Sequence, residues 1–333
     1  MEPQSNKLAF TICSANYLAQ AIALGDSLLQ HNPSYTFVIG LVDEINENKD
    51  LPVPITYPLI PIKDIEIPNF NGFCAQYNIT ELNTAVKPFY FSYLFDKNEA
   101  VQRIVYLDPD IFVYHSFELL EKHIASNQII LTPHITKPIN DDKYPTETDF
   151  LNAGIYNLGF IALRRGNESH ALIDWWKERL THLCKIDFEK GLFVDQLWLN
   201  FATLFYKEVF VLTNPGYNMA YWNLQERSLS KNEGGVYMVN SDYPLVFYHF
   251  SGFDLHKQYA ISKYQNRFDF SDRKDIMPLF NNYHQDVMSL GFDAFAAIPC
   301  KYITNSEKKK PSLIKQLVHQ LKNWKHSFLQ SNK

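Results

Sequence analysis

The sequence predicts an α/β fold, in which one domain is built on a central, mainly parallel β-sheet flanked by helices. Apolar runs of strand length alternate with helical patterns, and the first strand, helix and strand fall within residues 8–42. The 333 residues are 46% hydrophobic and 20% charged, which suits a large buried core and excludes an intrinsically disordered chain. We therefore expect one compact domain over residues 1–265 and a helical extension over residues 266–333.

Each element is predicted from its apolar pattern and from the residues that flank it. Apolar runs predict strands over residues 8–13, 36–42, 129–132, 151–163 and 246–250, and over residues 104–114 a strand that is broken by Asp-Pro-Asp and resumes as a second run. Helical periodicity predicts helices over residues 18–29, from a cap at Thr80 to residue 95, and over residues 117–124, 168–183 and 193–205. Residues 50–70 contain five prolines and are predicted to form an irregular connection with one edge strand.

Charge and cysteine content narrow the classes of function. A net charge of −5 argues against a general nucleic-acid-binding protein. The cysteines lie far apart without a Cys-x-x-Cys pair, so we expect buried thiols rather than a zinc site or a disulfide framework. The sequence has neither a signal peptide nor a segment of about 18 apolar residues. These features predict a cytoplasmic protein.

The most informative motif is Asp108-Pro109-Asp110, which follows an apolar strand. Ligands bind α/β sheets at the carboxyl ends of their parallel strands. Two carboxylates at positions i and i+2 offer the oxygen ligands that Mg²⁺ or Mn²⁺ prefers, and they leave coordination positions open for a diphosphate. The alternative interpretation is a polar turn that only ends the strand.

A histidine at the end of another strand is a second candidate ligand. His249 ends the apolar run 246–250 and precedes Ser251 and Gly252. An imidazole beside a small, flexible Ser-Gly pair suits a metal and phosphate site, because the backbone can approach a phosphate closely there. The alternative is a histidine that simply packs in the core.

Two further positions carry charged or polar groups. Asp195 and Gln196 open the helix predicted over residues 193–205, where an acid is also favoured by the helix dipole. Lys87 stands on the helix that precedes the strand ending in Asp108. Taken alone, Lys87 is equally well interpreted as a solvated lysine.

In their order and spacing these motifs resemble glycosyltransferase family 8, which contains glycogenin and the bacterial lipopolysaccharide galactosyltransferases. The similarity spans about residues 8–256. In chain order it comprises Ser14-Ala15-Asn16-Tyr17 after the first strand, the helix with Lys87, Asp108-Pro109-Asp110, Asn152-Ala153-Gly154, Asp195-Gln196 and His249-x-x-Gly252. Each motif is short, but together their order is specific.

The resemblance implies a GT-A fold and transfer of a hexose from a nucleotide sugar, usually a UDP-sugar, with retention at the anomeric carbon. It implies a glycan, glycolipid or protein acceptor and, by analogy, bacterial surface-polysaccharide synthesis. The metal, Mn²⁺ or Mg²⁺, would be bound by Asp108, Asp110 and His249. The donor would be bound by Thr11, Ser14, Asn16, Tyr17, Lys87, Asn152, Gly154, Ser251 and Gly252, and the implied catalytic residues are Asp195 and Gln196.

The chain departs from the family pattern at one position. The family usually has a phosphate-binding lysine three residues after the glycine of His-x-x-Gly, and this position is Leu255 here, so that His256 or Lys257 would have to replace it. The segment 214–224 has no counterpart in the family pattern. Its Tyr, Trp and Asn residues suit a sugar acceptor site, and a plain core segment is the equal alternative.

Two other functions remain as alternatives. A haloacid dehalogenase-like phosphohydrolase also places Asp-x-Asp after a buried strand, but it needs Thr or Val where this chain has Phe112, and its motif lies near the N-terminus of the domain. A catalytically silent sugar-nucleotide or glycan-binding module on the same fold is the second alternative. The presence of all three metal-type residues argues against it.

The C-terminal segment predicts a basic amphipathic helix. From Lys301 onward there are eight lysines and one glutamate, a charge of +7 that leaves about −12 on the rest of the chain. Within residues 311–330 large apolar residues recur every three or four positions. Such a helix could lie on the inner face of an anionic membrane, or it could dock on the acidic domain.

Overall fold

The computed structural model describes residues 6–45 and 51–303. Seven strands of this part form one sheet in the order β10-β6-β7-β4-β1-β2-β3. Neighbouring strands are parallel except for β7, which runs antiparallel to both β4 and β6. The bounds are β1 Lys7–Cys13, β2 Thr36–Leu41, β3 Leu59–Pro61, β4 Arg103–Leu107, β6 Ile129–Pro133, β7 Tyr156–Arg164 and β10 Val209–Val211. The predicted α/β fold with a mainly parallel sheet is confirmed.

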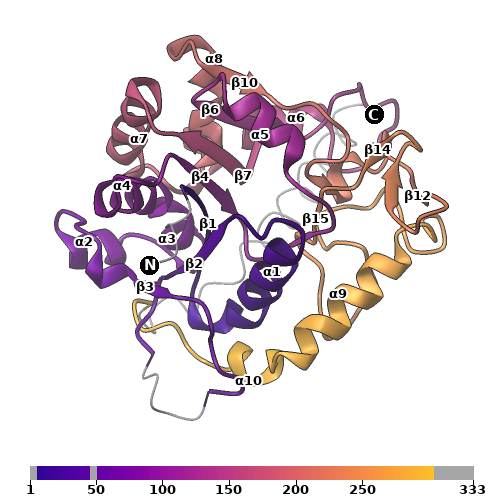
Figure 1. Cartoon of the computed structure of the whole chain (residues 1–333), viewed down its shortest axis with the longest axis horizontal. Coiled ribbons are helices and arrows are strands. Elements are labelled where there is room, and N and C mark those ends of the chain that lie inside the picture. Colours follow the sequence, from indigo (N-terminus) through magenta and orange to yellow (C-terminus); the bar gives the residue numbers. More distant parts are fainter. Residues whose placement is uncertain (1–5, 46–50, 304–333) are drawn as a thin grey trace, which may run out of the picture.

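Helices cover both faces of this sheet (Figure 1). Because side chains alternate along a strand, β1 sends Ala9 into one core and Phe10 into the other. The first core is covered by α1 Leu18–His31, α5 Glu118–Ile124, α9 Met277–Ser289 and α10 Phe292–Ala296. The second is covered by α2 Phe70–Ala75, α3 Ile79–Ala85, α4 Lys87–Lys97 and α7 Asn167–Leu180.

Short strands and helices beside the main sheet complete the fold. One small sheet has the order β11-β15-β5, a second β12-β13-β14, and a third pairs β8 with β9. The strand bounds are β5 Ile111–Val113, β8 Ile186–Asp187, β9 Leu192–Phe193, β11 Met219–Ala220, β12 Leu229–Lys231, β13 Tyr237–Val239, β14 Tyr243–Pro244 and β15 Phe247–His249. The remaining helices are α6 Glu147–Ala153, α8 Ala202–Phe205 and the 3₁₀ turns η1 Ala15–Tyr17, η2 Ile62–Asp64, η3 Phe188–Lys190, η4 Gln196–Phe201 and η5 Tyr221–Asn223.

Three predicted elements differ from the structure. The predicted cap at Thr80 is wrong, because the side chain of Asn78 accepts hydrogen bonds from the N–H groups of residues 80 and 81 and begins α3. The first residues of the predicted strand 151–163 belong to the helix α6, which ends at Ala153 with Gly154 as its C-cap, and β7 follows. The predicted helix 193–205 is mainly the 3₁₀ turn η4, and only its last four residues are α-helical.

Residues beyond 265 include two helices that pack on the domain. Leu279 and Phe280 of α9 and Phe295 of α10 belong to the core that α1 covers, and Figure 1 shows both helices beside α1. The domain boundary at residue 265 stays a prediction. The basic helix predicted over residues 311–330 lies outside the described residues, and none of the helices described is both long and apolar enough to cross a membrane.

Candidate active site

A pocket of about 270 Å³ opens where the carboxyl ends of β1 and β4 meet. The parallel pairing of these strands brings the residues that follow each of them to the same edge of the sheet. The pocket is lined by Ile12, Cys13, Ser14, Asn16, Tyr17, Ile79, Thr80, Asn83, Thr84, Tyr106, Asp108, Pro109 and Asp110. Three of the residues predicted to bind the donor, Ser14, Asn16 and Tyr17, and two of the predicted metal ligands therefore line one cavity.

The turn Asp108-Pro109-Asp110 is fixed by backbone hydrogen bonds. The Asp108 N–H donates to the Gly159 carbonyl at 2.8 Å, which continues the pairing of β4 with β7, and the Ile111 N–H closes the turn onto the Asp108 carbonyl at 3.1 Å. The Phe250 N–H donates to the Asp110 carbonyl at 2.8 Å. The two carboxylates thus project from a rigid turn into the pocket.

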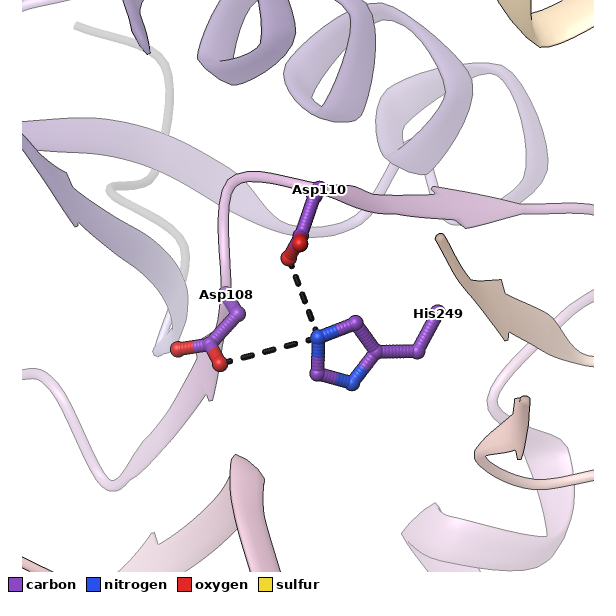
Figure 2. Close-up of side chains that lie close together, drawn as sticks. All are labelled: Asp108, Asp110 and His249. Carbon is purple, nitrogen blue, oxygen red and sulfur yellow. Dashed lines mark ion pairs between the residues drawn. The ribbon is translucent and has the colours of Figure 1, made fainter. Parts of the chain in front are cut away.

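Strand pairing brings His249 to these carboxylates. In the antiparallel pair of β15 and β5, His249 lies opposite Ile111, the residue after Asp110. Figure 2 shows the imidazole facing both aspartates, with Nε2 3.0 Å from Asp110 Oδ1 and 3.7 Å from Asp108 Oδ2. One ligand atom from each residue lies within 4.8 Å of the others, so this group could hold a metal ion.

The surroundings of His249 fit a metal ligand. Its side chain is 3% exposed, the edge of Trp222 packs on its ring with 5.1 Å between ring centres, and Nδ1 is buried without a hydrogen-bond partner. Burial alone would lower the pKa of His249, but the carboxylates of Asp110 and Asp108 outweigh it and raise this pKa. Two carboxylates and one imidazole are a donor set that suits Mn²⁺.

Lys87 and Asp195 form a buried ion pair behind Asp108. The Lys87 ammonium lies 2.5 Å from Asp195 Oδ2 and 3.9 Å from Asp108 Oδ1, and it donates to the Leu158 carbonyl at 2.8 Å. Its Nζ also lies 4.3 Å from the centre of the Tyr106 ring. Burial raises the pKa of Asp195, and Lys87 opposes this effect. Lys87 is therefore not the solvated lysine of the alternative interpretation.

The other residues predicted to bind the donor are placed in different surroundings. Gln196 donates to the Ala153 carbonyl at 2.9 Å, and Gly154, whose φ is +119°, packs so closely on the Gln196 backbone that a Cβ there would lie 3.2 Å from it. Gln196 and Gly154 are therefore in contact. Thr11 is fully buried on β1 and Asn152 lies exposed on α6, and neither lines the pocket.

The His-x-x-Gly element continues into a partly exposed loop. Ser251 and Gly252 are half-buried, and a Cβ on Gly252, whose φ is +74°, would lie 2.5 Å from the Tyr264 ring. Leu255 is buried in the core, which explains an apolar residue at this position. His256 and Lys257 are exposed and lie near Asp293 and Asp254, respectively. Whether either replaces the phosphate lysine stays a prediction.

The segment 214–224 is mostly core, as the alternative interpretation has it. Tyr217, Asn218, Trp222 and Asn223 are all buried, with exposed fractions of 2% or less. Tyr221 is the aromatic residue of this segment that stays partly exposed. An acceptor site built from the whole segment is therefore excluded.

Sequence reasoning missed several residues of the pocket wall. Asn83 of α3 donates to Ser14 Oγ at 2.8 Å, and the Tyr106 hydroxyl donates to Asp108 Oδ1 at 2.6 Å. A signal existed for Tyr106, because residues two apart on a strand share a face and Tyr106 precedes Asp108 by two. No local pattern marks Asn83, which reaches the pocket only through the packing of α3 on β1.

Comparison with curated proteins finds two bacterial relatives. The uncharacterized protein YfnF of Bacillus subtilis (strain 168) is 27% identical over 249 residues, which are 74% of this chain and 81% of that protein. The uncharacterized protein YfnD of the same organism is 23% identical over 248 residues, which are 74% and 77% of the two chains. No known family model matches the chain.

Comparison with solved structures finds glycosyltransferases. The glycosyltransferase GlyE of Streptococcus pneumoniae TIGR4 has a TM-score of 0.48 and 15% identity over 89% of this chain, which spans less than two thirds of GlyE (65%). The galactosyltransferase LgtC, solved in complex with donor and acceptor sugar analogs, has a TM-score of 0.45 and 11% identity over 88% of this chain and 97% of that one.

Proposed function

We propose that the chain is a metal-dependent glycosyltransferase with a GT-A fold. It would transfer a hexose from a UDP-sugar to a glycan, glycolipid or protein acceptor, with retention at the anomeric carbon. The observation that supports this proposal most is the group formed by Asp108, Asp110 and His249 at the mouth of the pocket. By analogy we assign the reaction to the cytoplasmic side of bacterial surface-polysaccharide synthesis.

Each part of the pocket has a role in this proposal. Asp108, Asp110 and His249 would hold Mn²⁺ or Mg²⁺, which as a Lewis acid neutralises charge on the departing diphosphate. Ser14, Asn16 and Tyr17, with Thr11 beneath them on β1, would hold the base, while Ser251 and Gly252 would approach the phosphates.

The buried pair of Lys87 and Asp195 is assigned to the donor sugar. Glycosyl transfer passes through a transition state that resembles an oxocarbenium ion, so a carboxylate near the anomeric carbon stabilises the developing positive charge. Lys87 opposes the effect of burial on Asp195 and so favours its charged form. Gln196, with Asn152 and Gly154, would complete the wall around the sugar.

Hydrolysis of UDP-sugars with and without Mn²⁺ tests the proposal against both alternatives. A glycosyltransferase slowly hydrolyses its donor to UDP and free hexose only when the metal is present. A phosphohydrolase would release inorganic phosphate from simple phosphate esters, and a silent binding module would bind UDP without turnover. Release of phosphate, or the absence of any metal-dependent release of hexose from UDP-glucose, UDP-galactose and related donors, would contradict the proposal.

A further inference from the structure

Several tyrosines lie near the strand end that carries His249. The ring of Tyr264 packs on Gly252, and its centre lies 6.2 Å from that of Tyr221. Tyr17 lines the pocket together with Asp110. Tyr144 is 38% exposed, and its backbone carbonyl accepts a hydrogen bond from the N–H of Asn266, two residues after Tyr264. Tyr264 therefore packs between Gly252 and Tyr221, and the segment that carries Tyr264 holds the backbone of Tyr144.

Tyr144 belongs to a loop over residues 136–146, which we call the tethered loop. One end is held by Arg267, which is 8% exposed. Its guanidinium donates to both carboxylate oxygens of Asp141 at 2.9–3.1 Å and to the carbonyls of Lys143 and Pro145 at 2.8 and 2.7 Å. The Tyr144 N–H and carbonyl also pair with Asn266, the residue before Arg267.

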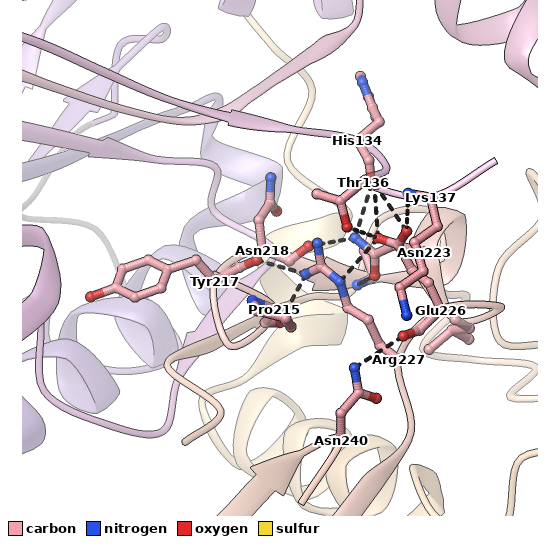
Figure 3. A network of polar contacts seen from close by, with 12 residues as sticks. His134, Thr136, Lys137, Pro215, Tyr217, Asn218, Asn223, Glu226, Arg227 and Asn240 are labelled. Atoms are coloured by element: carbon pink, nitrogen blue, oxygen red, sulfur yellow. Dashed lines mark hydrogen bonds and ion pairs between the residues drawn. The ribbon is translucent and has the colours of Figure 1, made fainter. Parts of the chain in front are cut away.

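The other end of the tethered loop is held by Glu226. Its buried carboxylate accepts hydrogen bonds from the N–H and hydroxyl groups of Thr136 and from the N–H of Lys137, at 2.6–3.1 Å. Figure 3 shows how this contact joins a network that includes Asn223, which donates to the His134 carbonyl at 3.1 Å. The same network fixes η5, the turn that carries Tyr221.

Buried charged residues hold the tethered loop, although most of the loop is exposed. Because burying a charge is unfavourable, their use here indicates that the conformation of the loop matters. Removing a charge from water is unfavourable, and well-packed apolar residues often give equal or greater stability. Glu226 and Arg267 instead bind backbone groups of the tethered loop, which fixes where its side chains lie. Beneath the loop, Ile135 and Ile139 pack against Phe150 and Trp222, and Trp222 contacts the ligand His249.

We propose that Tyr144, Tyr221 and Tyr264 bind the carbohydrate acceptor, and that Glu226 and Arg267 position the tethered loop for this purpose. Tyrosine suits a sugar because its ring packs on the apolar face of the pyranose and its hydroxyl pairs with ring hydroxyls. The site rests on the proposed glycosyltransferase function and adds the class and the place of the acceptor. Residues 136–149 carry four acids and two lysines, which disfavours an anionic polymer as the occupant.

Binding of the full chain to a glycan array, in the presence of UDP and Mn²⁺, tests the site directly. We expect the wild-type chain to select a set of glycans, and Tyr144→Ala and Tyr264→Ala to weaken the strongest of these about tenfold. UDP affinity, measured by calorimetry on the same samples, should stay unchanged. Tyr243→Ala is the matched control, because Tyr243 is similarly exposed (39%) and lies on β14, which carries none of the proposed acceptor residues.

The positioning role has its own variant. Asp141→Ala removes a partner of Arg267 at the exposed side of the tethered loop, so it should raise the acceptor KM without changing donor hydrolysis, and Asp141→Glu should restore it in part. Glycan binding that is absent in the wild type, or equal in wild type, Tyr144→Ala and Tyr264→Ala, would overturn the acceptor site. A wild-type chain that binds glycans through these tyrosines but not UDP would overturn the proposed function alone.

Discussion

Lys87 is the buried cation of the site and lies close to two of its carboxylates. Its ammonium lies 2.5 Å from Asp195 and 3.9 Å from Asp108, donates to the Leu158 carbonyl and lies over the Tyr106 ring. A buried ion pair of this kind contributes little stability by itself, but losing one partner leaves the other charge unpaired. Asp195 is therefore held in place near Asp108 rather than free to reorient.

The role of Asp195 predicts a specific kinetic change. If this carboxylate stabilises positive charge at the anomeric carbon, Asp195→Ala should lower kcat about 100-fold or more and leave UDP affinity nearly unchanged. Asp195→Ala also removes the ion-pair partner of Lys87 and leaves a gap. Asp195→Asn is therefore measured beside it, because this variant removes the negative charge but keeps the shape of the side chain. Steady-state kinetics measures kcat, and calorimetry measures UDP affinity. Weaker UDP binding with an unchanged kcat would instead assign Asp195 to binding of the nucleotide.

Gly159 makes room for His249 and gives a second prediction. A Cβ at this position would lie 2.4 Å from His249 Cε1, so Gly159→Ala must displace the imidazole. We expect Mn²⁺ affinity to fall about tenfold or more, as when the support of a metal ligand is changed. Gly234→Ala is the control, because the nearest neighbouring atom of its Cβ would lie 3.4 Å away. Equal Mn²⁺ affinity in the Gly159→Ala and Gly234→Ala variants, measured by calorimetry, would contradict this account of His249.

Residues of the site were predictable from the sequence where they follow a strand. Asp108, Asp110 and His249 lie at strand ends, and strand pairing alone brings them together. Asn83, Glu226 and Arg267 were not predictable, because they act through contacts between segments far apart in the sequence. The burial of Lys87 was also invisible, since a lysine on a helix is usually solvated.

At the scale of elements, the start of α3 is fixed by its N-cap residue, Asn78. The Asn78 side chain accepts hydrogen bonds from the N–H groups of Thr80 and Glu81, and the Glu81 carboxylate accepts one from the Asn78 N–H. Asn78→Ala should lower the free energy of unfolding by about 1 kcal/mol. Thr80→Ala, at the position that the sequence pattern suggested as the cap, should have little effect. Denaturant unfolding compares the two, and a larger loss for Thr80→Ala would contradict this cap.

Long apolar runs were predictable as elements, and short or polar ones were not. The apolar runs predict the strands β1, β2, β4 and β6 correctly. Both faces of these strands are buried, so their sequences contain few polar residues. The helix α6 begins with a capping box formed by Thr146 and Asp149. The apolar run 151–163 that follows is the stronger pattern, so the sequence predicted a strand there and not the end of a helix. The turn η4 follows the helical period too loosely to be distinguished from an α-helix.

At the scale of the whole molecule, charge is unevenly distributed along the chain. The segment after residue 300 contains eight lysines, while the rest of the chain has a net charge of about −12. We predict that the full chain sediments with anionic vesicles and that a chain ending at Ser306 does so far less, because each lysine near the surface contributes about 1 kcal/mol. Neutral vesicles are the control. Equally poor sedimentation of both chains with anionic vesicles would contradict membrane binding and favour a helix that docks on the acidic domain.

The most direct test of the metal site compares transfer and Mn²⁺ dependence in the wild type and in Asp110→Ala. The account predicts that this variant remains folded, as judged by thermal unfolding, yet loses transfer from the UDP-sugar and any response to Mn²⁺. Asp242→Ala, which removes an exposed acid elsewhere, should behave as the wild type does. Wild-type turnover with unchanged Mn²⁺ dependence in Asp110→Ala would contradict the account.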